Sequence, residues 1–447
     1  MNSSRLRVFV QFGFLGFLTW LGYRHQVLGG GPEGVPPVDA LCPFGGLESL
    51  YSVLASGEWL RRLAPSAMVL LFVLVAMTLL FGRVFCGWIC PLGTLGEWTS
   101  RAGARLGIRK RELHVRVDAA LRWLKYVVLV LIIAATWKAG TLVWRSYDPW
   151  VAWMHLSAGW DGFAESPWSF FSLFVLVIGL SLFIERFWCR YLCPLGAFLA
   201  PLQKIGLVKV RRSDEECIQC HRCGQVCPVR LDPEAKKVET SAECIACGRC
   251  VEACPEETAL FFGTKTLKTK VITVGALAMM LYSGGYGLAR ATGYWQTYAS
   301  PSISSDGNPT EAQLYGWMTL ENVSKTLEVS VEEILAAGSL PDDFPRDVPL
   351  KKIEGVNDEE LLEKIKTSLE SNIKSAPASL TPPNPDEIKG SMTMQEISKT
   401  WNLEGVKVFE TAGWPADTRQ DVPLKTLEGE LGKSVTDIRE AVKKLSK

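Results

Sequence analysis

Eight cysteines near the middle of the sequence repeat one spacing twice, and each copy ends in proline. Both copies read C-x2-C-x2-C-x3-C-P, over residues 217–228 and 244–255. Thiolates at this spacing hold three corners of a [4Fe–4S] cubane, and the fourth cysteine of each copy ligates the other cluster. The pattern therefore predicts two clusters. The first predicted ligand set is Cys217, Cys220, Cys223 and Cys254, and the second is Cys244, Cys247, Cys250 and Cys227.

Two other metal groups use parts of this pattern. Cys217 to His221 also matches the C-x-x-C-H string of covalent haem attachment, but a haem would leave Cys223, Cys227 and half of the second copy without a role. Paired C-x-x-C motifs bind zinc as well, yet eight cysteines in doubled order fit two cubanes better. A disulfide framework is disfavoured because the chain has 13 cysteines, an odd number, spread from residue 42 to residue 254.

Four more cysteines form two copies of a C-x3-C-P-L-G motif, 103 positions apart. On a helix this spacing places both sulfurs on one face, about one turn apart. Two such pairs that meet across a pseudo-twofold axis would supply four thiolates for a third cluster. Structural cysteines at a helix-to-proline break, or a disulfide, are the alternatives. The residues are Cys86 and Cys90 in the first copy, and Cys189 and Cys193 in the second.

Cys42 stands apart from these motifs, between Asp39 and Glu48 and beside Gly45-Gly46. A lone thiol usually packs without a chemical role. The two carboxylates are expected near a membrane boundary, where they would accept protons from a quinol. The sequence leaves both interpretations open.

The elements that position these cysteines are predicted from long apolar runs. A membrane-spanning helix needs about 20 apolar residues, because its backbone groups must all be paired internally. The first run also suits a signal peptide, but no A-x-A cleavage site follows it, so a retained helix is expected. Trp88, Trp188 and Tyr191 are expected to anchor the interface rather than to line an electron path. The five predicted spans are Val8–Leu28, Ser66–Phe81, Tyr126–Trp144, Phe170–Ile184 and Val271–Leu288.

Lysines and arginines gather in the loops on one side of these spans. Arg5 and Arg7 precede the first span, seven basic residues lie between 83 and 116, and others at 204–212 and 265–270 flank the cysteine-rich insert. By the positive-inside rule, the N-terminus and the insert are cytoplasmic and residues 290–447 are extracytoplasmic. We therefore predict a multi-pass protein of a prokaryotic inner membrane. The balance of 48 Lys+Arg against 47 Asp+Glu gives no charge suited to nucleic acid.

The charged tail contains an internal repeat at an offset of 74 residues. The strings G-[WS]-M-T, S-K-T and D-V-P-L-K recur, starting at 316, 324 and 347 in the first copy and at 390, 398 and 421 in the second. Each copy is predicted to be a short helical module that ends in a helix, Asp358–Leu369 or Val435–Leu445. Four prolines in residues 375–385 indicate a linker. Neither copy contains Cys or His, so a docking role is expected.

The paired C-x3-C-P motifs followed by the doubled cysteine octet resemble the NapH/MauN/NosR group of polyferredoxin-like membrane proteins, over residues 1–290. The resemblance implies electron exchange between the quinone pool and a partner, through the insert cysteines and the four C-x3-C cysteines. Residues 213–260 are similar to bacterial two-cluster ferredoxins, which implies a compact ββα pseudo-repeat. The chain lacks the [ST]-G-A-[ST] flavin-attachment string of the NosR branch, so covalent FMN is not expected, and the duplicated tail is an addition.

The prediction for the whole chain is a mainly α membrane protein. It has about five transmembrane helices in duplicated pairs, a 2[4Fe–4S] ferredoxin-like α+β insert and a small duplicated α-helical extracytoplasmic tail. Its expected function is quinone-linked electron transfer, as a quinol dehydrogenase-like subunit of a larger oxidoreductase complex. Lipid, quinone and redox subunits docked on the insert or the outer repeats are the expected partners. A redox-sensing regulator and an assembly or metal-reductase factor of the cytochrome-oxidase type are the alternatives. The expected divisions are 1–210, 211–262, 263–292, 293–372 and 373–447.

Overall fold

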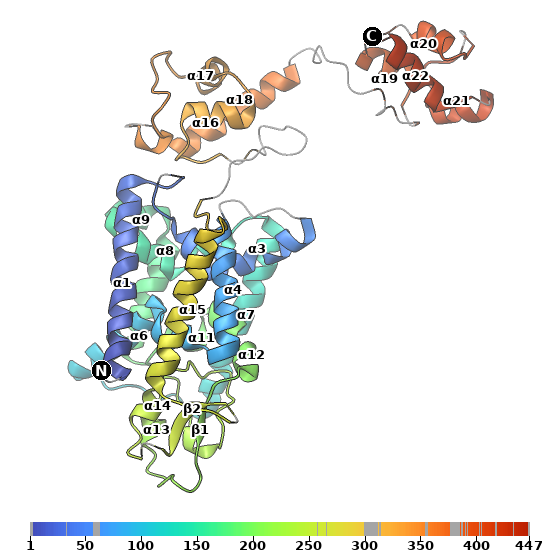
Figure 1. The fold of residues 1–447 in the computed structure, drawn as a ribbon. Helices are drawn as coiled ribbons and strands as arrows, with labels where there is room; N and C mark the ends of the chain where they lie inside the picture. Colours follow the sequence, from blue (N-terminus) through green and yellow to red (C-terminus); the bar gives the residue numbers. More distant parts are fainter. Residues whose placement is uncertain are drawn as a thin grey trace.

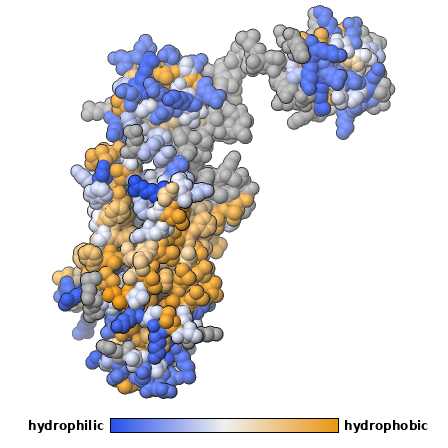
Figure 2. Space-filling model, viewed as in Figure 1, coloured by the Kyte–Doolittle hydropathy of each residue, from blue (hydrophilic) through white to orange (hydrophobic). Residues whose placement is uncertain are grey.

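An apolar belt separates two polar ends of the molecule. The computed structural model places a bundle of upright helices, here called the membrane part, between the cysteine-rich insert at one end and the first tail repeat at the other (Figure 1). The side of the bundle seen in Figure 2 is hydrophobic, and both ends are hydrophilic. We call these the insert end and the tail end. The structure describes residues 3–445 except 33, 57–62, 257, 265, 299–311, 313, 354–355, 376–384, 386–387, 389, 391, 402, 404, 416–417 and 432.

Three helices in the described residues are long and apolar enough to cross a membrane: α1 (Ser3–Leu28), α7 (Val115–Ala139) and α15 (Val271–Ala291). Two predicted spans correspond to shorter apolar helices, α4 (Pro65–Phe81) and the segment Pro167–Leu182. That segment starts as α10 (Pro167–Phe171) and continues through a π-helical stretch, η3 (Ser172–Gly179), and a short 3-10 turn, η4 (Leu180–Leu182). Large apolar side chains on the long helices are exposed around the bundle, as lipid contact requires.

The predicted third span is wrong at its C-terminal end. Helix α7 stops at Ala139 because Gly140 adopts a left-handed backbone conformation (φ 65°) that caps it. Trp144 instead lies in a separate 3-10 turn, η1 (Val143–Ser146), and its side chain is only 8% exposed. The chain therefore turns back into the bundle at the tail end rather than leaving it.

Several helices too short to span line the tail end. They escaped the sequence analysis because their apolar runs are brief. Helix α3 (Pro43–Ser56) packs along α4, where a Cβ atom on Gly46 would lie 2.7 Å from the Ala67 carbonyl oxygen. The close approach explains why glycine suits that position. The short elements are α2 (Val38–Leu41), α3 (Pro43–Ser56), α8 (Pro149–Met154), η2 (Leu156–Ala158) and α9 (Gly159–Glu165).

Each C-x3-C-P motif breaks a helix rather than lying along one helical face, so the predicted geometry is wrong. Cys86 lies in α5 (Val84–Trp88), but Cys90 is the N-cap of the next helix, α6 (Pro91–Arg105). The second copy repeats this with α11 (Phe187–Tyr191) and α12 (Pro194–Ile205). Proline favours the first helical position and forces the residue before it out of helical geometry. The second cysteine of each motif therefore sits at a helix N-terminus.

The insert, residues 209–269, combines a small antiparallel sheet with short helices. Strand β2 (Leu260–Gly263) pairs with both β1 (Lys209–Arg212) and β3 (Lys268–Thr269), in the order β1-β2-β3. Val210 faces Phe262 in the register, and both are buried. The sheet thus pairs the first residues of the insert with residues near its end. The remaining elements are α13 (Arg222–Gln225), η5 (Pro233–Ala235) and α14 (Arg249–Glu252).

The two tail repeats contain equivalent hydrogen bonds, at positions related by the same offset as their sequences. The Leu350 N–H donates to the Met318 carbonyl at 3.0 Å, and the Leu424 N–H donates to the Met392 carbonyl at 3.0 Å. Ser391 and most of residues 375–385 lie outside the described residues. The first repeat contains α16 (Leu320–Leu327), α17 (Val331–Gly338), η7 (Leu350–Lys352) and α18 (Asp358–Ser375). The second contains α19 (Met394–Trp401), α20 (Gly405–Thr411), α21 (Leu424–Leu431) and α22 (Val435–Leu445).

Candidate iron–sulfur centres

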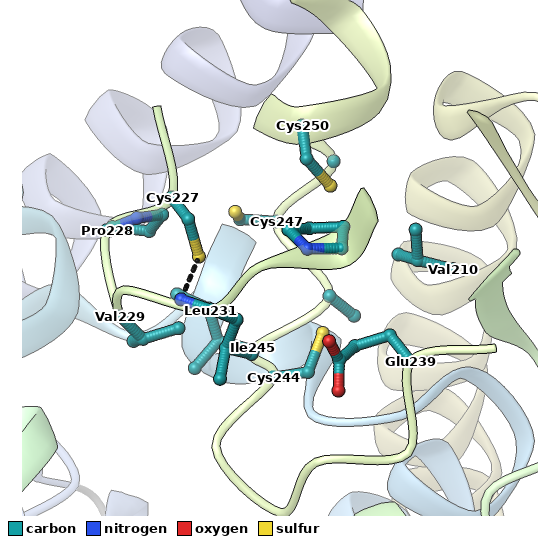
Figure 3. A pocket seen from close by; sticks show the side chains of 13 residues that line it. Val210, Cys227, Pro228, Val229, Leu231, Glu239, Cys244, Ile245, Cys247 and Cys250 are labelled. Atoms are coloured by element: carbon teal, nitrogen blue, oxygen red, sulfur yellow. Dashed lines mark hydrogen bonds between the residues drawn. The ribbon is translucent and has the colours of Figure 1, made fainter. Parts of the chain in front are cut away.

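The insert brings its eight cysteines together in two sets of four, each around one cavity. Figure 3 shows the first cavity, where the thiol of Cys227 comes from one sequence copy and the other three thiols come from the other copy. The second cavity has the converse composition, since Cys254 joins the cysteines of the first copy. The fourth cysteine of each copy therefore crosses over. The sets are Cys227, Cys244, Cys247 and Cys250 in one cavity, and Cys217, Cys220, Cys223 and Cys254 in the other.

The two cysteine loops have the same unusual backbone. Gln219 and His221 in the first loop, and Ala246 and Gly248 in the second, all have positive φ angles between 48° and 79°. These positions correspond at an offset of 27 residues. Such turns direct backbone N–H groups to one side, as loops around anionic clusters require. An N–H group already reaches a sulfur at Leu231, whose amide lies 3.3 Å from Cys227 Sγ (Figure 3).

The donor set suits cubane clusters better than single ions. Among the described residues, no three His, Cys, Asp or Glu side chains are close enough together to hold one metal ion. A zinc site would need four ligands at about 2.0–2.3 Å from one ion, whereas a cubane spreads its thiolates over four irons. Burial raises the pKa of Cys244 to about 12 and that of Cys227 to about 11. Iron would displace these protons on binding, as thiolate ligation requires.

The four-cysteine site, Cys86, Cys90, Cys189 and Cys193, is assembled at the insert end of the membrane part. The thiol of Cys86 lies close enough to those of the other three for their charges to interact. Cys193 Sγ accepts a hydrogen bond from the Gly196 N–H at 3.3 Å. Cys90 and Cys193 also lie at helix N-termini, whose dipoles favour thiolate. The structure thus brings together the two motifs that the sequence separates by 103 residues.

Two buried arginines beside this site were missed by the sequence analysis. Arg83 contacts the Cys86 thiol, and Arg186 interacts electrostatically with Cys189. Both are fully or almost fully buried, at 2% and 0% exposed. They also stand 103 positions apart, as the two motifs do. Alignment of the two motif copies would therefore have indicated that these arginines are equivalent. Their positive charges would stabilise an anionic cluster held by the four thiolates.

Each arginine packs against the motif of the other copy. A Cβ atom on Gly93 would lie 2.8 Å from a guanidinium nitrogen of Arg186, and a Cβ atom on Gly196 would lie 2.9 Å from one of Arg83. The two glycines therefore leave room for the reciprocal arginines. This reciprocal packing is what a pseudo-twofold relation between the two motif copies predicts.

A buried carboxylate balances one of these arginines. Glu97 accepts hydrogen bonds from Arg186 at 2.7 Å and from Arg7 at 2.7 Å, and a further one from Arg101 at 2.5 Å. The side chains of Glu97 and Arg186 are both 0% exposed. Arg7 was predicted to be a loop cation on one side of the membrane, but its side chain lies in this ion-pair network and is 2% exposed.

The insert is fixed to the membrane part by ion pairs and by one close backbone contact. Lys125 of α7 bonds Glu243, next to Cys244, at 2.5 Å, and Arg249 bonds Glu185 at 2.5 Å. A Cβ atom on Gly87 would lie 2.5 Å from the Ile245 carbonyl oxygen and 3.0 Å from Cys247 Cα. Gly87 immediately follows Cys86, so the four-cysteine site and the Cys247 cavity adjoin through this contact.

Replacing Gly87 by valine should therefore separate the insert from the membrane part. Overpacking at a closed contact costs about 1–3 kcal/mol, so we expect a lower thermal unfolding temperature and a weaker association of the insert. Gly284→Val in α15 is the matched control, because a Cβ atom there meets nothing within 4 Å. Differential scanning fluorimetry of both variants in detergent checks this. Equal shifts for the two variants would argue against a tight contact at Gly87.

The aromatic residues predicted to anchor the interface lie in the core instead. Trp88, Trp188 and Tyr191 are 2%, 4% and 1% exposed, so the anchor interpretation is wrong. The residues around Cys42 gather at the tail end. Asp39 pairs with Arg145 at 3.1 Å, while Glu48 accepts a hydrogen bond from Thr136 at 2.8 Å inside the bundle.

Two family models match the chain. One, described as a 4Fe-4S binding domain, matches residues 63–113 and 166–213, and each range contains one C-x3-C-P motif. The other, described as a 4Fe-4S dicluster domain, matches residues 209–255. These matches confirm iron–sulfur binding as the chemistry of the chain. No solved structure matches it.

Relatives with known names match the same region. YccM of Escherichia coli is 34% identical over 197 residues, which are 43% of this chain and 54% of YccM. NirI of Paracoccus denitrificans is 35% identical over 224 residues, which are 48% of this chain and 31% of NirI. The chain thus spans about half the length of YccM and about a third of NirI. The ferredoxin-type protein NapH of Escherichia coli is 31% identical over 226 residues, 50% of this chain and 74% of NapH. With most of NapH covered and both iron–sulfur models matched, the chain belongs to the NapH/MauN/NosR family of polyferredoxin-like, 4Fe–4S electron-transfer proteins.

Proposed function

We propose that this protein carries electrons between the quinone pool and a partner redox protein through three [4Fe–4S] clusters. Two clusters belong to the insert and the third to the four-cysteine site. The clusters supply one-electron storage, and the chain fixes where they lie. The observation that carries the proposal is the contact of Gly87 with Cys247, which joins the ligand loop of one site to that of the next.

The order of the sites follows from their burial. The four-cysteine site adjoins the cavity of Cys247, and the remaining cavity contains Cys220, which is exposed at the surface of the insert. A partner would therefore exchange electrons at the Cys220 side, and quinone at the membrane part. We place the insert in the cytoplasm and the tail outside, because the Lys and Arg residues of the loops favour that orientation. The protein then acts as the quinol dehydrogenase-like subunit of a larger complex, and the tail repeats serve as a docking module for another subunit.

Iron and acid-labile sulfide counts on anaerobically purified protein test the cluster number. We expect about twelve irons per chain for three cubanes, against about eight for the insert alone. Addition of a short-chain quinol to the oxidised protein in detergent should then produce the paramagnetic signal of reduced clusters. Full reduction by dithionite but none by quinol would contradict a quinone-linked role and favour a sensor or an assembly factor.

A further inference from the structure

Two buried tryptophans connect the tail end of the membrane part with the four-cysteine site. The rings of Trp144 and Trp188 are stacked, with centroids 5.9 Å apart and planes inclined at 25°. Trp188 directly precedes Cys189 and is 4% exposed, while Trp144 is 8% exposed. The pair thus extends from beside Cys189 of the four-cysteine site to the turn that follows α7, and it is almost entirely enclosed by the bundle.

Trp144 is held at its other side by two buried carboxyl groups. Its backbone N–H lies 3.4 Å from Glu48 Oε1, and its indole N–H donates to Asp148. Thr136 orients Glu48 with a hydrogen bond of 2.8 Å, and the Trp150 N–H orients Asp148 at 3.0 Å. A tryptophan fixed in this way keeps one orientation, and its stacking on Trp188 is kept with it.

The same carboxyl groups are suited to exchange protons near neutral pH. Glu48 and Asp148 lie outside the spanning helices, and burial raises the pKa of each to about 7. Both interact electrostatically with Asp39. Asp39 lines a cleft of about 930 Å³ between the tail end and the first repeat, together with Arg145, His155 and Lys351. Protons that leave Glu48 or Asp148 can therefore reach the surface by way of Asp39 and the other polar groups of the cleft.

We propose that the stacked pair Trp144–Trp188 is the electron path between the tail end of the membrane part and the four-cysteine site, with Glu48 and Asp148 taking up the accompanying protons. This inference rests on the proposed function, because it needs a hydroquinone as donor. Oxidation of one hydroquinone to quinone releases two electrons and two protons. The electrons would tunnel one at a time through the stacked indoles, which are not themselves oxidised, to the iron–sulfur centres that the cysteines would hold, and the protons would pass to the two carboxylates.

Trp144→Leu tests the path, with Trp150→Leu as the matched control. Trp150 is also 8% exposed and lies at the same end, but no ring contact involves it in the described part of the chain. Its hydrogen bond to Asp148 comes from the backbone N–H, which leucine keeps. Trp144→Phe keeps an aromatic ring and covers the case in which the leucine variant folds poorly. Stopped-flow mixing with a short-chain quinol gives the rate of cluster reduction. Anaerobic redox titration with paramagnetic resonance gives the cluster content and midpoint potentials, which do not depend on the path.

Leucine removes the ring that stacks on Trp188 and so widens the gap that the electron must cross. A change of about 1 Å in the placement of reacting groups can cost up to about a hundredfold in rate, so we expect Trp144→Leu to slow quinol-driven reduction about tenfold. Trp144→Phe should be slowed less, and Trp150→Leu should match the unaltered chain. Cluster content and midpoint potentials should be the same in all four proteins. Unchanged rates in both Trp144 variants overturn the path but leave the proposed function standing, and so do equal losses in Trp144→Leu and Trp150→Leu. Failure of quinol to reduce the unaltered chain overturns both proposals.

Discussion

Replacing Cys193 by alanine is expected to lower the iron content from about twelve to about eight atoms per chain, because a [4Fe–4S] cluster is held by four thiolates. The insert clusters should remain and should still be reduced by dithionite. Their reduction by quinol should be lost, since the site that adjoins Cys247 would no longer store an electron. Iron analysis and paramagnetic resonance of the purified variant provide the measurement.

Cys42→Ala is the control for Cys193→Ala. Cys42 lies at the tail end, where its thiol is 3.7 Å from Asp148, and it belongs to none of the three predicted ligand sets. Its replacement should leave the iron content unchanged. If Cys193→Ala also retained all of its iron, the thiols of the C-x3-C-P motifs would be structural and the third cluster would be absent.

Replacing Glu97 by alanine is expected to be the most destabilising single change outside the cluster ligands. It leaves Arg7 and Arg186 buried without their common carboxylate. Removing one partner of a buried ion pair costs about 3–5 kcal/mol, because the remaining charge stays desolvated. Thermal unfolding in detergent should show a large fall in the transition temperature, or the variant should fail to accumulate.

Glu112→Ala gives the matched comparison for Glu97→Ala. Glu112 also pairs with an arginine, Arg230, at 2.8 Å, but its side chain is 78% exposed. Solvent screens such a pair, and its loss costs about 0–1 kcal/mol. Similar falls for the two variants would show that burial does not govern the strength of the Glu97 network.

The insert was the most predictable part of the molecule, because its ligand sets follow from the spacing of cysteines that are close in the sequence. The C-x2-C-x2-C-x3-C-P spacing indicates both the cofactor and the crossing of the fourth cysteine, and the structure gathers Cys227 and Cys254 accordingly. The helical character of the membrane part and the family were equally accessible from apolar runs and motifs. The apolar helices of the structure confirm the first of these predictions, and the ferredoxin-type relatives confirm the family.

The charges around the four-cysteine site depend on contacts that no local pattern encodes. Glu97 and Arg7 are 90 residues apart in sequence and meet only when α1 packs on α6. A basic residue near the N-terminus, such as Arg7, is normally interpreted as a topology signal. The residues next to it in the sequence do not indicate that it is buried. The predicted end of α7 was wrong for a different reason. A single glycine in the left-handed conformation ends the helix, although apolar residues follow it.

The exchange of arginines between the two motifs means that neither half of the membrane part completes its own interior. A single-motif chain would obtain the same packing only as a symmetric homodimer, which would offer the insert two identical faces. Fusion of both copies in one polypeptide removes that ambiguity. At the offset of 103, Glu97 corresponds to Ala200, so only the first copy has the carboxylate that pairs with a buried arginine. Gly87 corresponds to Arg190, so only the first copy allows the close approach of Cys247. The two related halves therefore differ in charge, and only the half that contains Gly87 can receive the insert closely.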